Sequence, residues 1–256
     1  MKQFCFTIDD NIRFLKELSR QGMGSLFEHP YLAMLGRLHQ RFGLKVQLNL
    51  FYRTEGFDLS QVNERYRKEW EAHADWLKLS FHSEWENVRP YAKSGYDAVF
   101  QDCSAVHQQI LRFASSASLG ETTTVHYCQT TSEGVKALAD NGVKGLLGLF
   151  GTTENPGTSY SLGPAEASRI RAGETLLVNG MAFAAIDMVI NSVKLEQIVP
   201  RLTALLSRGA IHVMIHEQYF YEDYRAYQPD FEEKLITVFE LLCDNGYQSS
   251  FFEKMI

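Results

Sequence analysis

The sequence predicts a mixed α/β fold in which parallel strands are covered by helices. Short apolar segments that read as strands alternate along the chain with segments of helical spacing. The strand segments are mainly apolar throughout, which is typical of parallel strands buried on both faces. The chain has 256 residues, and its roughly seven or eight strand–helix repeats favour a barrel over an open doubly wound sheet. We therefore expect a single barrel-like domain over residues 1–256.

Each expected strand ends close to a polar or ionisable residue. The first, KQFCFTID (2–9), ends in two carboxylates, and the second, LKVQLNLFYR (44–53), alternates with a period of two. A later strand is expected within AFAAIDMVIN (182–191), ending near Asp187. The strands expected to pair in parallel lie near residues 3–8, 45–51, 77–82, 123–128, 144–149 and 211–216.

The expected helices fill the intervals between these strands. Glycines end two of them, at Gly43 and Gly142. Residues 152–180 differ, because turn-forming pairs such as Asn179-Gly180 are frequent there and predict short hairpins rather than a helix. The helices are expected over residues 29–42, 60–73, 95–114, 131–142, 194–209 and 230–246.

Composition and charge exclude several classes of protein. The 25 Lys and Arg against 31 Asp and Glu give a net charge of −6, which argues against non-specific nucleic-acid binding. No signal-peptide core and no apolar run of about 18 residues is present, so we expect a cytoplasmic protein without a membrane span. The four cysteines form no C-x-x-C pair and are expected to be buried free thiols. The oligomeric state stays open.

Ionisable side chains collect where the expected strands end. The carboxyl ends of barrel strands meet at one rim, so these residues are expected to lie together. Aspartate, histidine and a further carboxylate form a donor set that suits a divalent cation such as Zn²⁺, which polarises a carbonyl and acidifies water. A neighbouring carboxylate and a histidine could then transfer protons. The residues are Asp9, Asp10, His82, Glu86, His126, Gln129, Asp187, His216 and Glu217.

Three of these segments resemble motifs of one enzyme family. FTIDD (6–10) resembles the first motif, T-F-D-D, of the NodB-homology polysaccharide deacetylases, carbohydrate esterase family four. HSEWE (82–86) resembles the second, H-[ST]-x-x-H, with a glutamate at the last position, and VMIH (213–216) resembles the final apolar-x-His motif. The resemblance covers nearly the whole chain and implies the family's distorted (β/α)₇ barrel as a single domain.

The resemblance also implies roles for individual residues. Asp9 would be the catalytic base, and His216 the general acid. Asp10, His82 and Glu86 would hold a divalent metal ion, which we expect to be Zn²⁺. The implied reaction is removal of an acyl group, acetyl in particular, from an N-acetylated carbohydrate or a related small amide.

Two further family motifs are altered. The R-x-P-Y-G motif is not evident, and VHYCQTT (125–131) stands in its place, so His126 and Tyr127, together with Trp85, are expected to bind substrate. Asp187 occupies the place of an Asp-Trp pair whose tryptophan is missing. We expect its carboxylate to be the partner of His216 and to stabilise the protonated ring.

Other interpretations stay open at this stage. Asp9 and Asp10 could simply cap the following helix, and the aromatic residues near the rim could stack on sugars or serve packing alone. The chain could bind carbohydrate without hydrolysing it, or it could be a different barrel enzyme, such as a glycosidase with paired carboxylates. Among the remaining histidines, His212 is expected to be structural, and four are expected at the surface: His29, His39, His73 and His107.

Overall fold

The long strands of the chain form one parallel sheet. In the computed structural model, which describes residues 2–86, 91–150 and 160–256, the strand order is β10–β11–β1–β2–β5, with β12 beside the start of β1. All pairs in this sheet are parallel, as predicted. The strands are β1 (Lys2–Asn11), β2 (Val46–Phe51), β5 (Leu77–Ser83), β10 (Met188–Val189), β11 (Ala210–His216) and β12 (Tyr247–Ser249).

A second sheet contains shorter strands in the order β6–β7–β9–β8. Its members are β6 (Thr122–Thr123), β7 (Gly145–Gly148), β8 (Leu176–Val178) and β9 (Met181–Ala185). The antiparallel pair β8–β9 turns at Asn179-Gly180, where φ is 51° and 82°, so the hairpin expected at this dipeptide is confirmed. A separate two-stranded ribbon joins β3 (Arg53–Thr54) to β4 (Phe57–Asp58).

The two sheets are joined into a distorted ring, which agrees with the expected distorted barrel. At one junction, Leu79 of β5 donates its N–H to Ser118 O and accepts from Gly120 N–H, both at 2.8 Å. At the other, Ile186 and Asp187, between β9 and β10, donate backbone N–H groups to β7 and β11. Because β10 continues the path of β9, seven strand positions surround the interior: β1, β2, β5, β6, β7, β9 and β11.

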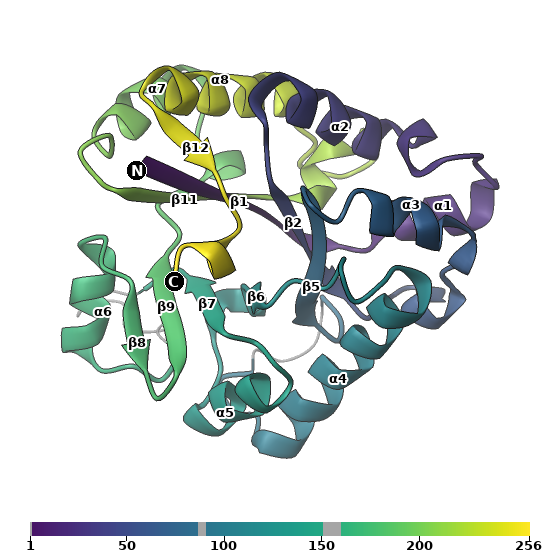
Figure 1. Cartoon of the computed structure of the whole chain (residues 1–256), viewed down its shortest axis with the longest axis horizontal. Coiled ribbons are helices and arrows are strands. Elements are labelled where there is room, and N and C mark those ends of the chain that lie inside the picture. The colour runs from purple at the N-terminus through teal and green to yellow at the C-terminus, as the bar shows by residue number, and fades with distance from the viewer. Residues whose placement is uncertain (1, 87–90, 151–159) are drawn as a thin grey trace.

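Helices surround this ring (Figure 1). They are α1 (Arg13–Gln21), α2 (Pro30–Phe42), α3 (Arg67–Ala72), α4 (Tyr96–Phe113), α5 (Ser132–Asp140), α6 (Pro164–Arg171), α7 (Leu195–Thr203) and α8 (Phe231–Asp244). Helix α1 was not predicted. Helix α6 corrects the expectation of hairpins alone over residues 152–180, of which 152–159 lie outside the described residues. No helix in the described part of the chain is long and apolar enough to cross a membrane.

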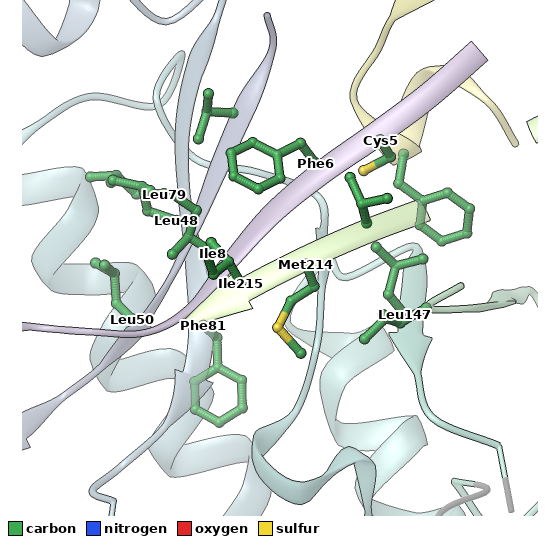
Figure 2. Close-up of a cluster of buried hydrophobic side chains, with 14 of the residues drawn as sticks. Cys5, Phe6, Ile8, Leu48, Leu50, Leu79, Phe81, Leu147, Met214 and Ile215 are labelled. Atoms are coloured by element: carbon green, nitrogen blue, oxygen red, sulfur yellow. The ribbon is translucent and has the colours of Figure 1, made fainter. Parts of the chain in front are cut away.

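Alternation along the strands separates an apolar outer layer from a more polar interior. Phe6 of β1 meets Phe239 of α8 edge-on at 5.0 Å, so the even-numbered side chains of β1 face the helices. Figure 2 shows part of the resulting core around Ile8, Leu48 and Ile215. The odd-numbered positions, such as Asp9, point into the ring and lead to the functional site.

Burial corrects the expected positions of two histidines and confirms those of three cysteines. His29 and His107 lie in the interior, which corrects their expected surface positions. Among the four cysteines, which are all free, Cys243 is half-buried and the other three are buried. Burial raises the pKa of Cys128 to about 12, so this thiol stays protonated at neutral pH.

Candidate active site

A bulge in β1 brings two consecutive carboxylates to the same side of the sheet. Adjacent strand residues normally point to opposite faces. The register between β1 and β2 shifts between Ile8 and Asn11, and Asp10 has a φ of 62°. This left-handed conformation costs a non-glycine residue roughly 1–2 kcal/mol, and Asp tolerates it better than most. The bulge therefore turns Asp10 toward the cavity that Asp9 also lines.

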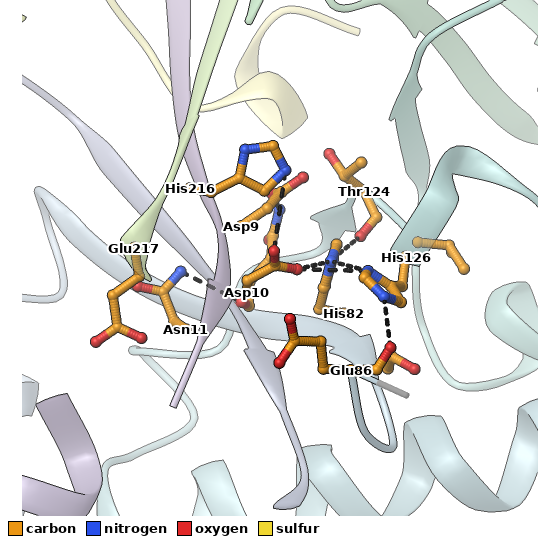
Figure 3. A network of polar contacts seen from close by, with 12 residues as sticks. Asp9, Asp10, Asn11, His82, Glu86, Thr124, His126, His216 and Glu217 are labelled. Carbon is orange, nitrogen blue, oxygen red and sulfur yellow. Dashed lines mark hydrogen bonds and ion pairs between the residues drawn. The ribbon is translucent and has the colours of Figure 1, made fainter. Parts of the chain in front are cut away.

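Three potential metal ligands converge at this rim. Asp10 Oδ1 lies 3.0 Å from His82 Nε2 and 3.4 Å from His126 Nδ1, and the two ring nitrogens are 3.1 Å apart. All three residues are in the interior of the protein. Figure 3 shows them meeting from β1, β5 and the turn after β6.

Backbone carbonyl groups fix the orientation of both imidazole rings. His82 Nδ1 lies 2.6 Å from Thr124 O, and His126 Nε2 lies 3.1 Å from Glu86 O. Each of these nitrogens must donate its hydrogen, since a carbonyl oxygen only accepts. The two nitrogens that face each other then carry lone pairs in the neutral rings, next to a carboxylate. Such an arrangement requires a cation or an added proton between them.

The donor set fits a divalent cation. A tetrahedral zinc site with bonds of about 2.0–2.1 Å places its ligand atoms roughly 3.3 Å apart, close to the three separations observed here. Hydrogen bonding of the remote histidine nitrogens to carbonyl groups is the usual support for such ligands. The site could therefore hold a divalent cation on Asp10, His82 and His126.

The pKa values of the two aspartates are shifted in opposite directions. Burial raises the pKa of Asp9 above its usual value, against the lowering effect of His82, His216 and the Asn49 hydrogen bond. Burial acts the same way on Asp10. With the added proton between the rings and this carboxylate, however, the hydrogen bonds from His126 and His82 outweigh burial and hold the pKa of Asp10 well below its usual value. Asp10 is thus ionised at neutral pH.

His216 faces the two aspartates from the adjacent strand. It pairs with Asp9 in the β1–β11 register, and its Nε2 lies 4.0 Å from Asp10 Oδ2. Its Nδ1 lies 2.9 Å from Asn191 Oδ1 and must donate to it, because an amide oxygen accepts. Asp9, Asp10 and His216 therefore lie together, as expected.

The structure does not bring Glu86 and Asp187 to their expected places. His126, not Glu86, is the third member of the cluster, and Glu86 contributes its backbone carbonyl while its side chain is exposed at the cavity. Asp187 forms an ion pair with Arg208 and accepts the backbone N–H of His212. The expected Asp187–His216 pair is corrected, since Asn191 occupies that place.

The rim encloses a cavity of about 490 Å³. Among the expected substrate-binding residues, His126 and Tyr127 line it, and Tyr127 is 53% exposed. Trp85 is not part of its lining and lies under the Arg53 guanidinium at 4.8 Å. Tyr219 also lines the cavity, so two tyrosine rings belong to its lining.

Sequence reasoning missed three carboxamides that support the ionisable groups. Asn49 Nδ2 donates to Asp9 Oδ1 at 2.7 Å, and Gln218 Nε2 donates to Asp10 Oδ2 at 2.7 Å, while Asn191 holds His216. Asn49 lies on the polar side of the period-two alternation in β2, and Gln218 comes two residues after His216. Their positions in the sequence could therefore have marked both residues as candidates for the site.

The capping interpretation of the two aspartates is wrong. The backbone N–H groups of Ile12, Arg13 and Phe14, which open α1, all donate to the buried Glu217 carboxylate at 2.7–3.0 Å. Glu217, which directly follows β11, therefore caps the N-terminus of α1. The side chains of Asp9 and Asp10 are not needed as caps and line the cavity instead.

Comparison with known proteins connects this site to a fold family. No family model and no curated protein sequence matches the chain. Among solved structures, it is similar to a Mycobacterium smegmatis protein assigned to the polysaccharide deacetylases, with 10% identity, a TM-score of 0.60, and coverage of 99% of this chain and 89% of that one. A second similar structure is a family 4 acetyl xylan esterase from Clostridium thermocellum, in complex with a cobalt ion. It has 13% sequence identity and a TM-score of 0.53, and the match covers 99% of this chain and 89% of that one.

A third similar structure has a different activity. The 4-alpha-glucanotransferase from Thermococcus litoralis has 12% identity and a TM-score of 0.61, and this chain, matched over 99% of its length, spans 40% of that enzyme. At such identities the likenesses establish the fold alone. They confirm the distorted barrel that the motif resemblance implied, and the chemistry has to be argued from the site.

Proposed function

We propose that this protein is a divalent-metal-dependent hydrolase that removes an acyl group, acetyl in particular, from an N-acetylated carbohydrate or a related small amide. The observation that carries the proposal is the convergence of two imidazole lone pairs and the Asp10 carboxylate beside Asp9 and His216. The family 4 esterase in complex with cobalt supports a metal on this fold.

Asp10, His82 and His126 would hold the cation, which we expect to be Zn²⁺. When bound, a divalent cation polarises an acyl carbonyl and lowers the pKa of water toward 7. The two carbonyl groups that hold His82 and His126 keep the correct ring nitrogens unprotonated for this role.

Asp9 and His216 would move the protons. Asp9 takes a proton from the water that attacks the acyl carbon, while Asn49 holds its Oδ1. His216 gives a proton from Nε2 to the departing nitrogen as the C–N bond breaks, with Nδ1 retained on Asn191. The products are a carboxylic acid and a free amine.

The cavity suits a sugar-sized substrate. Its volume of about 490 Å³ lies within the usual range for small-molecule sites. Tyr127 and Tyr219 line the cavity and offer aromatic rings on which a sugar ring can stack. The polysaccharide-directed names of the structural neighbours support the same class of substrate.

The proposal is tested by metal exchange and acetate release. After a chelator has removed its metal, the protein should release no acetate from N-acetylated glucosamine oligomers. Added Zn²⁺ or Co²⁺ should restore acetate release. Asp9→Asn should lower kcat by about 10²-fold or more, as loss of a general base usually does, with the metal content unchanged. An ester panel tests whether amides are preferred.

Two results would overturn the proposal. Acetate release that is unaffected by chelation would remove the metal from the reaction. Oligosaccharide binding by the metal-loaded protein, with no release of acetate from any amide or ester, would favour a binding protein on the same barrel.

A further inference from the structure

We infer that Gln47 is a positioning residue that acts through Asn49 to hold Asp9 in its reactive orientation. The inference rests on the proposed function and goes beyond it, because Gln47 lies inside the ring and touches neither the cavity nor the metal-ligand cluster.

Gln47 occupies an interior position that usually holds an aliphatic side chain. It lies in β2 between Val46 and Leu48 and is 1% exposed. Bulky branched residues normally fill the inside of α/β barrels. A buried amide costs free energy unless all its groups are hydrogen-bonded, so stability alone does not favour Gln47 over an aliphatic residue.

All polar groups of the Gln47 side chain have partners. Nε2 donates to Asn49 Oδ1 at 2.8 Å and to Thr122 O at 2.9 Å, and Oε1 accepts from Thr122 Oγ1 at 3.1 Å. These contacts permit one orientation of the amide, since a flip would place its oxygen against two acceptors. The bend before β6 is also shaped around it, because a Cβ at Gly120 would lie 2.7 Å from Oε1.

The fixed orientation of Gln47 sets the orientation of Asn49. Because Asn49 Oδ1 receives the Gln47 donor, Nδ2 must point the other way, toward Asp9 Oδ1 at 2.7 Å. A flipped Asn49 would place its oxygen against the Asp9 carboxylate. Within the described residues, Asn49 supplies the hydrogen bond that reaches the Asp9 side chain, so Asp9 depends on this relay for its position.

The relay uses neutral groups throughout. A cationic tether would also hold Asp9, but it would add a positive charge next to a site intended for a divalent cation. The carboxamides fix the carboxylate without that charge. The chain from Thr122 through Gln47 and Asn49 to Asp9 therefore fixes the orientation of the carboxylate without adding a net charge.

The test compares Gln47→Met with Ser80→Ala. The first substitution keeps the side-chain length and removes the donor to Asn49. The second removes another buried hydrogen bond to the same Thr122 carbonyl from the cross-strand partner of Asn49, and it leaves the hydrogen bonds of the Asn49 side chain in place. We expect Gln47→Met to lower kcat about 10-fold with KM and metal content within about 2-fold of the wild type, and Ser80→Ala to leave kcat within about 2-fold.

A double-substitution cycle separates positioning from a general structural role. In an Asp9→Asn background, Gln47→Met should cause no further loss of kcat, because the group that it positions no longer acts as a base. An equal loss in both backgrounds, or equal effects of Gln47→Met and Ser80→Ala, would overturn the inference.

If the wild-type protein has no hydrolase activity, crystal structures of the variants can still test the role of Gln47. That result would refute the proposed function, but the relay would still predict a rotated Asp9 carboxylate and a reoriented Asn49 amide in Gln47→Met. An unchanged Asp9 in that structure would overturn the inference independently of activity.

Discussion

The two sheets contribute to the same site in different ways. The long-strand sheet supplies Asp9, Asp10, His82 and His216 from the ends of strands of seven to ten residues. The short-strand sheet supplies His126 from a turn that follows a strand of two residues. Strand pairing places Asp9, His82 and His216, and a bulge in β1 adds Asp10. The turn that carries His126 lies outside the strand ladders and needs its own local supports.

Those supports include strained backbone. Tyr127 and Cys128 have φ values of 61° and 54°, an unusual pair of consecutive left-handed residues. The buried Tyr160 hydroxyl connects the start of this turn to β7, because it accepts the Val125 N–H and donates to Leu147 O. The comparison teaches that the backbone carrying His126, the third residue of the candidate metal site, is held by a tertiary contact from Tyr160 rather than by strand pairing.

The largest expected effect separates His126 from Glu86. His126→Ala should lower metal affinity and kcat/KM by at least about 10³-fold, because a ligand is lost. Glu86→Ala should change metal affinity by less than about 3-fold, since its backbone carbonyl keeps the contact to His126. Metal titration followed by acetate assays measures both. The reverse order would return Glu86 to the ligand set.

A second test concerns Glu217, the buried cap in the long-strand region. Burial raises the pKa of Glu217 from its ordinary 4.5 to about 7. The folded state therefore binds this proton more tightly than the unfolded state does. The resulting contribution of Glu217 to the free energy of unfolding is fully present below pH 4.5 and is lost as the pH rises through 7. The change amounts to roughly 3 kcal/mol over that window.

Denaturant unfolding at several pH values measures this effect. Glu217→Gln cannot titrate, so its free energy of unfolding should change less between pH 4.5 and 7 than that of the wild type. Parallel pH profiles for the two proteins would show that the carboxyl does not have the raised pKa.

A third test weakens the short-strand region alone. Tyr160→Phe leaves the buried Val125 N–H without its partner and should lower the free energy of unfolding by about 2 kcal/mol. Metal affinity should fall by up to about 10-fold as the turn loosens. The matched control is Tyr247→Phe, which removes a hydroxyl bonded to Arg208 O and should leave metal affinity unchanged. Equal metal affinities in both variants would contradict the supporting role of Tyr160.

The smallest expected effect distinguishes two aromatic residues near the site. Tyr127→Ala should raise KM for an oligosaccharide by about 3- to 10-fold, the value of one stacking contact. Trp85→Ala should change KM by less than about 2-fold, because Trp85 is not among the residues lining the cavity. Steady-state kinetics with both variants decides between them, and a larger effect at Trp85 would extend the binding surface toward Arg53.

The sequence by itself determined the parallel α/β architecture and the place of five residues at the rim, including His126, whose expected role was to bind substrate. Strand alternation and helical spacing are local signals, and the ends of neighbouring parallel strands must meet, so Asp9, Asp10, His82 and His216 could be predicted to lie together. Helix α6 was missed because the turn-forming residues around it outweighed its own weak pattern.

Only the tertiary structure decided which groups complete the site. His126 replaced Glu86 because a short strand and a left-handed turn aim its ring at Asp10, and neither feature has a sequence period. Asn191 replaced Asp187 because the β9–β10 path places Asp187 beside Arg208. Contacts between residues far apart in the chain depend on backbone paths and side-chain directions, which residue order alone does not contain.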